Sequence, residues 1–284
     1  MALRIVTDST ADIRGEEVEK LGIEVVPLNV LFGQKSYLDG VDLGPEEFYK
    51  LLQTEKEFPR TSQPAPGEFM KIFSDAKEKG DEVLYLGVSS GLSGTFNSAS
   101  IASNEIGYDG IHLFDTLESI QALHLMVEIA VKMKDDGEPL QKILDEMDFL
   151  KHHIKTVSSI DTLTYLKKGG RLSGAAAFIG NIIGLKIFVD LDLNGKIRVC
   201  GKCLGGKAAL KLLSFEVKNN PPMEGYPLSY GYTDKDTNMI LFKNKMEETM
   251  GEKDYFISQI GPAIGSHIGP GGFDLAYVCA KERK

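Results

Sequence analysis

The segment from Asp81 to Ala102 is the feature that most constrains how this chain folds. It opens with a short apolar run, DEVLYLG, of the kind that forms a buried strand. A turn rich in glycine and hydroxyl groups, VSSGLSGT, follows at residues 88–95, and the residues from Phe96 onward have helical spacing. A strand, a turn and a helix in this order indicate an α/β fold.

The turn at residues 88–95 is a candidate anion site. Backbone N–H groups at the start of a helix lack partners, and the helix dipole favours negative charge there. Ser93 and Thr95 add hydroxyl donors, while Gly91 and Gly94 allow a ligand to approach the backbone. A capped turn without a ligand explains the same residues, so both interpretations stand at this point.

The first half of the chain alternates between expected strands and expected helices. Strands are expected at residues 3–8, 23–31, 81–87 and 110–116, and helices at 16–20, from 44, after a stiff loop at 60–69, at 96–102 and at 119–133. Ser9 or Thr10 is expected to cap the first helix, and Pro27 indicates a sheet edge or a bulge. The alternation predicts an N-terminal, Rossmann-like, mostly parallel sheet with helices on both faces.

Ligands of such sheets bind at the carboxyl ends of the strands. Asp8, Ser93 and Asp115 follow expected strands and are therefore candidates for that edge. Thr61 and Ser62 lie in a loop with two prolines, which hold these hydroxyls more firmly than an ordinary loop does. Thr61 reaches the same edge if its loop folds back.

The pattern changes in the second half of the chain. After a helix through residues 140–147 we expect a strand at 154–160, a helix at 161–168, a hairpin of 186–192 and 196–200, helices near 208–217 and 238–250, and strands at 228–233 and 274–280. These elements predict a smaller C-terminal α/β domain with a mixed or antiparallel sheet. We expect domains at 1–155 and 156–284, with the ligand site between them.

Composition excludes several classes of partner. The net charge of −9 disfavours binding to nucleic acid. The sequence has no polybasic segment that would bind a membrane surface, so at most transient membrane contact is expected. No apolar run is long enough to span a bilayer. The first residues enter a strand at once, without an export signal, so the cytoplasm is the expected location.

Cys200 and Cys203 form a CxxC pair, which a redox centre or half of a zinc site would also show. Cys279 is the only further cysteine, and no histidine of suitable spacing completes a zinc site. Two small apolar side chains on a hairpin strand are therefore the favoured interpretation.

Two glycine-rich runs approach catalytic motifs without matching them. The run GKCLGGKA at 201–208 has Ala208 where a P-loop has its magnesium-binding hydroxyl, so it is interpreted as a turn before a helix. The run GLSGT at 91–95 resembles a nucleophile elbow with Thr95 in place of the second glycine. A Ser93-dependent esterase or acyltransferase remains as the alternative function, although no aspartate and histidine of convincing spacing follow.

His267 lies in IGPAIGSHIGPGG, at 260–272, where many glycines and prolines imply tight backbone geometry or close approach to a bound molecule. A surface loop explains it equally. The basic run at 167–171 could dock an acidic partner or a phosphate, although a helix C-terminus attracts cations in any case. His112 and His124 are interpreted as structural, and no metal site is predicted.

Several of these motifs together resemble the DegV family. They are DSTAD at 8–12, TSQP at 61–64, SSGLSGT at 89–95, LKKGGR at 166–171 and the run around His267, and their order matches from the first strand to the last. Each motif is weak alone, and their common order and spacing make the resemblance strong.

The resemblance implies two α/β domains with a long-chain fatty acid, such as palmitate, bound between them. It implies that Thr61, Ser93 and the backbone at Gly94 hold the carboxylate, with His267 close by. Ser62 and Thr95, the hydroxyls next to these groups, complete the predicted site. The implied protein is a carrier without catalytic residues or a cofactor other than the bound fatty acid.

Some relatives present the fatty acid to a kinase that phosphorylates the carboxylate, so a fatty acid kinase subunit is a possible partner. This sequence departs from the family pattern at Ile187, where proline is usual, and at 204–206, where relatives often carry arginine. The second departure puts the kinase partnership in question. The apolar segment at 175–185 is a candidate lining for the fatty acid tail.

Overall fold

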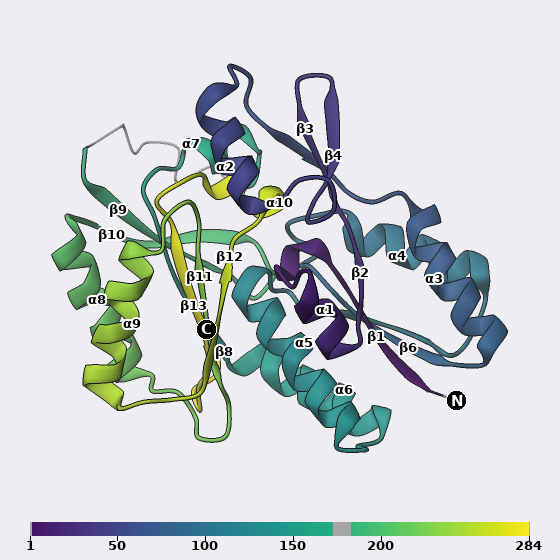
Figure 1. Cartoon of the computed structure of the whole chain (residues 1–284). Helices are drawn as coiled ribbons and strands as arrows, with labels where there is room; N and C mark the ends of the chain where they lie inside the picture. The colour runs from purple at the N-terminus through teal and green to yellow at the C-terminus, as the bar shows by residue number, and fades with distance from the viewer. Residues whose placement is uncertain (1, 173–182, 284) are drawn as a thin grey trace.

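The computed structural model describes residues 2–172 and 183–283, and their strands form three sheets (Figure 1). The first sheet is entirely parallel, as the alternation of strands and helices predicted. Its strands, in spatial order, are β2 (Glu24–Val26), β1 (Leu3–Asp8), β6 (Glu82–Gly87) and β7 (Ile111–Asp115).

Helices cover both faces of the parallel sheet because its strands are apolar on both sides. Val6, Val83 and Tyr85 pack on one face against α3 (Pro66–Lys79) and α4 (Thr95–Ile106). Ile5 and Leu84 pack on the other face against α5 (Ile120–Asp135). Successive residues of a strand point to opposite faces, so one short run contributes to two cores.

The second sheet is mixed, and its strands, in spatial order, are β10 (Ile197–Leu204), β9 (Leu185–Leu191), β8 (Ile154–Ile160), β13 (Phe273–Val278), β11 (Leu228–Tyr232) and β12 (Tyr255–Gln259). Within it, β11 and β12 pair in parallel and the other neighbours pair antiparallel. The helices α8 (Gly206–Asn219) and α9 (Thr237–Met250) pack on its outer face, shown in green in Figure 1.

Helix α5 lies between the two large sheets and packs against strands of both. Its residues 121–127 and 129–131 are all buried, so it has no solvent-facing side over most of its length. A helix that is buried on nearly all sides is expected only in such a position. The chain then passes through α6 (Leu140–His153) directly into β8.

A small antiparallel sheet covers the junction at one end of the molecule. It contains β4 (Lys35–Leu38), β3 (Asn29–Phe32) and β5 (Arg60–Ser62). Two helices flank it, α2 (Pro45–Thr54) and α10 (Pro262–Ile268), and α10 also contacts α7 (Thr164–Lys168). The small sheet and its flanking helix α10 therefore bring together residues from the N-terminal and C-terminal parts of the chain.

Two local predictions are wrong. Neither Ser9 nor Thr10 caps α1 (Glu16–Leu21), because both belong to a short 3-10 helix, η1 (Ser9–Ala11), and the residue before α1 is Gly15. The expected strand at 23–31 is two strands in different sheets, because Pro27 interrupts pairing between β2 and β3.

The segment expected to line the fatty acid tail falls largely on residues 173–182, which lie outside the described residues. Within the described ranges, no helix has both the length and the apolar character needed to cross a membrane.

Candidate functional site

The turn after β6 is held by its own hydroxyl groups. Ser89 Oγ accepts a hydrogen bond from the Gly91 amide at 3.1 Å and donates to the Gly195 carbonyl at 2.8 Å. Ser93 Oγ lies 2.8 Å from Thr95 Oγ1 and accepts from the Thr95 amide at 3.3 Å. The hairpin turn at Gly195 thus contacts the glycine-rich turn that leads into α4.

Thr61 and Ser62 lie on a strand rather than in the expected loop. Thr61 is paired with Val30 in the register of β3 and β5, and it is partly buried. Successive side chains of a strand point in opposite directions. Ser62 is accordingly exposed and does not line the cavity that Thr61 lines.

His267 lies near the end of α10, a helix that the glycines and prolines of this segment did not indicate. Its Nε2 is 2.8 Å from Thr61 Oγ1. Burial, with the nearby charge of Arg171, lowers the pKa of His267 to about 4. The imidazole is therefore neutral at neutral pH, and one ring nitrogen carries a proton.

Arg171 is the cation of this site. Its Nε donates to the Leu92 carbonyl at 3.0 Å, and its Nη1 donates to the Gly169 carbonyl at 2.7 Å. Gly169 is needed here because a Cβ at that position would stand 2.1 Å from Nδ1 of His267. The LKKGGR motif therefore positions both a guanidinium and an imidazole.

Thr61, Ser93, Arg171 and His267 line one cavity of about 70 Å³. Most of the remaining wall is apolar and is contributed by Leu28, Val88, Leu92, Ile120, Ile197, Ala263, Ile264 and Ile268. A hydroxyl group from β5, a hydroxyl group from the turn after β6 and a cation therefore line the same largely apolar cavity. The cavity is smaller than the roughly 300–1,000 Å³ of pockets that enclose a whole ligand.

Gly94 and Thr95 lie beside this cavity and do not line it. Thr95 is fully buried against Ser93. A Cβ on Gly94 would stand 1.8 Å from the side-chain oxygen of Gln63, whose amide nitrogen donates to Ser98 at 2.8 Å. These contacts dock the TSQP strand onto the start of α4.

The acidic motifs at the ends of β1 and β7 hold the backbone around the cavity. Asp8 accepts from Thr10 Oγ1 at 2.6 Å, from Tyr85 Oη at 2.8 Å and from the Val88 amide at 2.9 Å. Asp115 accepts from the amides of Ser90 and Leu117, each at 3.2 Å. Neither carboxylate lines the cavity.

Asp12 connects the first motif to the last. It adopts a positive φ of 58°, accepts from the Gly261 amide at 3.1 Å and forms an ion pair with Arg14. Gly261 precedes α10, so Asp12 fixes the start of the helix that carries His267. Burial raises the pKa of Asp12 to about 6.

Sequence reasoning missed most of the cavity wall. Ile120 lines it from the first turn of α5 with a positive φ of 52°, which is rare for a β-branched residue. The sequence leaves the run ending at Arg171 open as a dock for an acidic partner or a phosphate or as the basic end of a helix, and it does not place Arg171 at this cavity. An apolar residue and an arginine carry no local signal of a ligand site, because only tertiary structure brings them together.

Comparison with known proteins identifies the family. The DegV family model matches residues 2–279 of this chain. The chain belongs to the DegV family.

DegV-family relatives share the whole length of the chain. A DegV domain-containing protein of Listeria innocua is 34% identical over 97% of this chain and 98% of its own. A protein of Thermotoga maritima named "Fatty acid-binding protein" is 31% identical, with both chains fully covered. A solved DegV-family structure from Thermus thermophilus, described by its fatty acid binding, is 30% identical, with a TM-score of 0.88 over 98% of this chain and 100% of that one.

The CxxC pair does not have the features of an activated thiol centre. Both cysteines lie on β10, and Cys200 is exposed there. Although the residue as a whole is exposed, desolvation of its thiol and the neighbouring charge of Asp190 raise the pKa of Cys200 to about 11. Reactive cysteines have a lowered pKa, so the raised pKa of Cys200 does not favour a role as a nucleophile.

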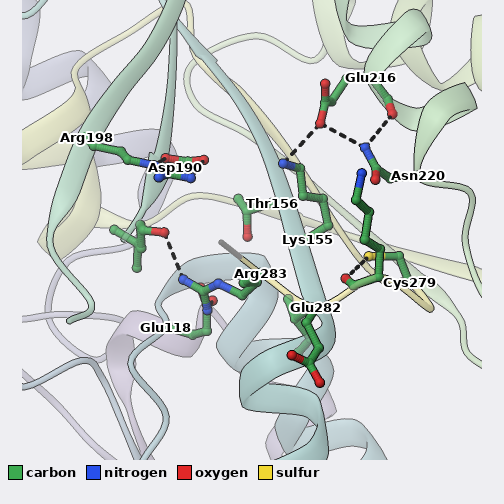
Figure 2. Close-up of a pocket in the computed structure, with 13 residues that line it drawn as sticks. Glu118, Lys155, Thr156, Asp190, Arg198, Glu216, Asn220, Cys279, Glu282 and Arg283 are labelled. Atoms are coloured by element: carbon green, nitrogen blue, oxygen red, sulfur yellow. Dashed lines mark hydrogen bonds and ion pairs between the residues drawn. The ribbon is translucent and has the colours of Figure 1, made fainter. Parts of the chain in front are cut away.

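A second cavity, polar and of about 160 Å³, lies away from the DegV motifs (Figure 2). Arg283 forms an ion pair there with Glu118 and donates to the Leu191 carbonyl at 2.8 Å. Lys155 and Glu216 pair at 3.1 Å on the opposite wall. Burial raises the pKa of Glu118 to about 8 despite the adjacent guanidinium.

Proposed function

We propose that this DegV-family protein binds a long-chain fatty acid, with the carboxylate between Thr61 and Ser93. The observation that carries the proposal is that both hydroxyls, with Arg171 and His267, line one cavity that is otherwise largely apolar. A fatty acid has the same division into one anionic group and one apolar tail. The relatives described by fatty acid binding support the same assignment.

The carboxylate would be held by donors and by one positive charge. A neutral His267 that donates from Nε2 to Thr61 Oγ1 leaves the Thr61 hydroxyl proton free for the ligand. The Arg171 guanidinium neutralises the carboxylate, which cannot be buried without a partner. Ser93 supplies a second hydroxyl. These groups set the orientation of the ligand.

The tail would supply most of the affinity. Each buried methylene contributes about 0.8 kcal/mol, so about fifteen contribute roughly 12 kcal/mol before the costs of association. One hydrogen bond contributes only about 0.5–1.5 kcal/mol. Because the cavity is about 70 Å³, a complete tail displaces apolar side chains along the wall as it enters.

The protein would act as a carrier. An esterase needs a base next to the Ser93 hydroxyl. Here Ser93 Oγ forms a hydrogen bond with Thr95 Oγ1, and Nε2 of His267 forms one with Thr61 Oγ1. The relatives named above are described by binding rather than by turnover. Presentation of the fatty acid to a kinase partner remains a prediction of the family resemblance, and mixing the loaded carrier with such a kinase and ATP tests it through acyl phosphate formation.

Mass spectrometry and titration test the binding proposal. Native mass spectra of gently purified protein should show one bound acyl chain, and delipidated protein should bind palmitate or oleate at micromolar concentration. Ser93→Ala and Thr61→Val should each weaken binding by about fivefold to a hundredfold, the cost of roughly 1–3 kcal/mol for an unpaired polar group.

The matched controls are Ser100→Ala and Thr54→Val, because each hydroxyl bonds only to the carbonyls of its own helix. Both should leave the dissociation constant unchanged. Delipidated wild-type protein that binds neither fatty acid would contradict the proposal. Hydrolysis of a p-nitrophenyl ester that disappears in Ser93→Ala would favour the esterase instead.

A further inference from the structure

Three side chains outside the fatty acid cavity converge where α1 meets α5. Glu17 comes from α1, and His124 and Glu128 lie one turn apart on α5. One nitrogen and two carboxylate oxygens from this triad lie within 4.8 Å of one another. We propose that Glu17, His124 and Glu128 form a binding site for a divalent transition metal ion, with zinc as the best match.

The distances fit metal ligands better than hydrogen bonds. His124 Nε2 is 3.4 Å from Glu17 Oε1 and 3.9 Å from Glu128 Oε1, whereas N–H···O bonds are about 2.7–3.2 Å. Zinc binds nitrogen and oxygen at about 2.0–2.1 Å, so the edges of its tetrahedron are about 3.4 Å. The Glu17–His124 distance equals such an edge, and the Glu128–His124 distance is about 0.5 Å longer, so a small shift of the Glu128 carboxylate would complete the coordination.

His124 is an unusual residue for its surroundings. Its side chain has no solvent exposure, and in the described part of the chain neither ring nitrogen has a hydrogen-bond partner. Buried polar groups are rarely left unpaired because their desolvation is costly. A metal ion at Nε2 would satisfy that nitrogen. The Phe256 ring packs on the imidazole, with centroids 4.4 Å apart, and fixes its orientation.

Among the described residues, no lysine or arginine forms an ion pair with either carboxylate. Across residues 2–172 and 183–283, the ion pairs of Glu17 and Glu128 are with His124 alone. The two side chains are 34% and 29% exposed, so an ion can reach them from solvent. The positive charges of Arg14 and Lys20 act on Glu17 without pairing with it. A divalent cation between the three donor atoms would neutralise the two carboxylates directly.

The ligand set indicates the class of metal. One imidazole and two carboxylates are the His and Glu donors found in zinc sites, and three protein ligands leave a fourth position for water. Calcium and magnesium take oxygen donors and are disfavoured by the histidine. A bound ion would link the short helix α1 to the buried helix α5.

Direct metal binding tests the site. Full-length protein treated with EDTA is titrated with zinc chloride by calorimetry, and with cobalt chloride while the visible d–d absorption is recorded. We expect one ion per chain, a tetrahedral cobalt spectrum and a zinc-dependent rise in Tm. Glu17→Gln and Glu128→Gln should each weaken zinc affinity at least tenfold and abolish the cobalt spectrum.

The controls separate this site from other metal-binding groups. Glu19→Gln, at an exposed position on α1, and the double variant Cys200→Ser/Cys203→Ser should bind zinc as the wild type does. Loss of zinc binding in the cysteine variant, wild-type affinity in both Glu17→Gln and Glu128→Gln, or no binding by the wild type would each overturn the proposal. His124→Gln is a further variant. The Glu17→Gln and Glu128→Gln variants decide the question, because these two positions are partly exposed and tolerate substitution better than the buried His124.

Discussion

Thr61 and His267 lie 206 positions apart in the chain, yet Thr61 Oγ1 and His267 Nε2 are 2.8 Å from each other. The first residue belongs to the small antiparallel sheet, and the second to α10 near the C-terminus. This contact exists only when both ends of the chain have folded. The cavity it borders is therefore a property of the complete tertiary structure.

Gly169→Ala should weaken ligand binding although it replaces none of the side chains proposed to bind the ligand. The added Cβ would stand 2.1 Å from Nδ1 of His267 and must displace the imidazole from Thr61. We expect the dissociation constant for palmitate to rise about tenfold, which corresponds to about 1.4 kcal/mol. Gly206→Ala is the control, because that glycine has open space around it and no positive φ. Equal affinities for wild type and Gly169→Ala would show that the imidazole position does not matter.

His267 should make the protein less stable in acid. Its pKa is about 4 when folded and about 6.5 in an unfolded chain, so between these values the unfolded state binds more protons. The stability that the neutral imidazole contributes is complete above pH 6.5 and is lost as the pH falls toward 4. Tm measured from pH 7 to pH 4 should fall more steeply for the wild type than for His267→Gln. Parallel curves for the two proteins would contradict this assignment.

Asp274 should make the protein less stable as the pH rises. It is buried, accepts from Ser158 Oγ at 2.5 Å and has its pKa raised to about 7 by burial. The folded state holds a proton that the unfolded state releases near pH 4, so stability is lost as the pH rises through 7. Between pH 5 and pH 8, urea unfolding should show a smaller loss for Asp274→Asn than for the wild type. The exposed Asp254→Asn should follow the wild type.

Arg283→Gln should be tolerated better at low pH than at high pH. Glu118 is 2% exposed and has a pKa of about 8, so below pH 7 it is mostly protonated and leaves no unpaired buried charge. Above pH 8 the carboxylate ionises and needs the guanidinium. We expect the variant to lose up to about 3–5 kcal/mol of unfolding free energy at pH 9 and clearly less at pH 6. A loss that is independent of pH would mean that Glu118 stays ionised throughout.

Local sequence patterns predicted the parallel sheet and the hairpin of the mixed sheet. The strand at 81–87, the long helix after Ser119 and the Asn194–Gly195 turn are found where periodicity and turn chemistry indicated them. Such elements are long or strongly patterned, so their own residues determine them. The fold class followed from their order.

The elements that the sequence did not reveal are short or carry unfavourable residues. Strand β5 has three residues and is stabilised by pairing with β3, and α10 contains Gly265 after a proline start. Both depend on tertiary contacts that override local preference. The family motifs indicated Thr61, Ser93 and His267, and the structure brings these three to one cavity. Arg171 joined them only through the fold.

The position of α5 has a consequence for how a ligand is released. A clamshell movement about a hinge between the two large sheets would separate one of them from this helix and expose apolar area at about 25 cal/mol per Å². The free-energy cost of that movement rises with the apolar area exposed. We therefore expect a fatty acid bound as proposed to enter and leave through rearrangement of the rim around the Thr61 strand and α10, with the contacts of α5 kept intact.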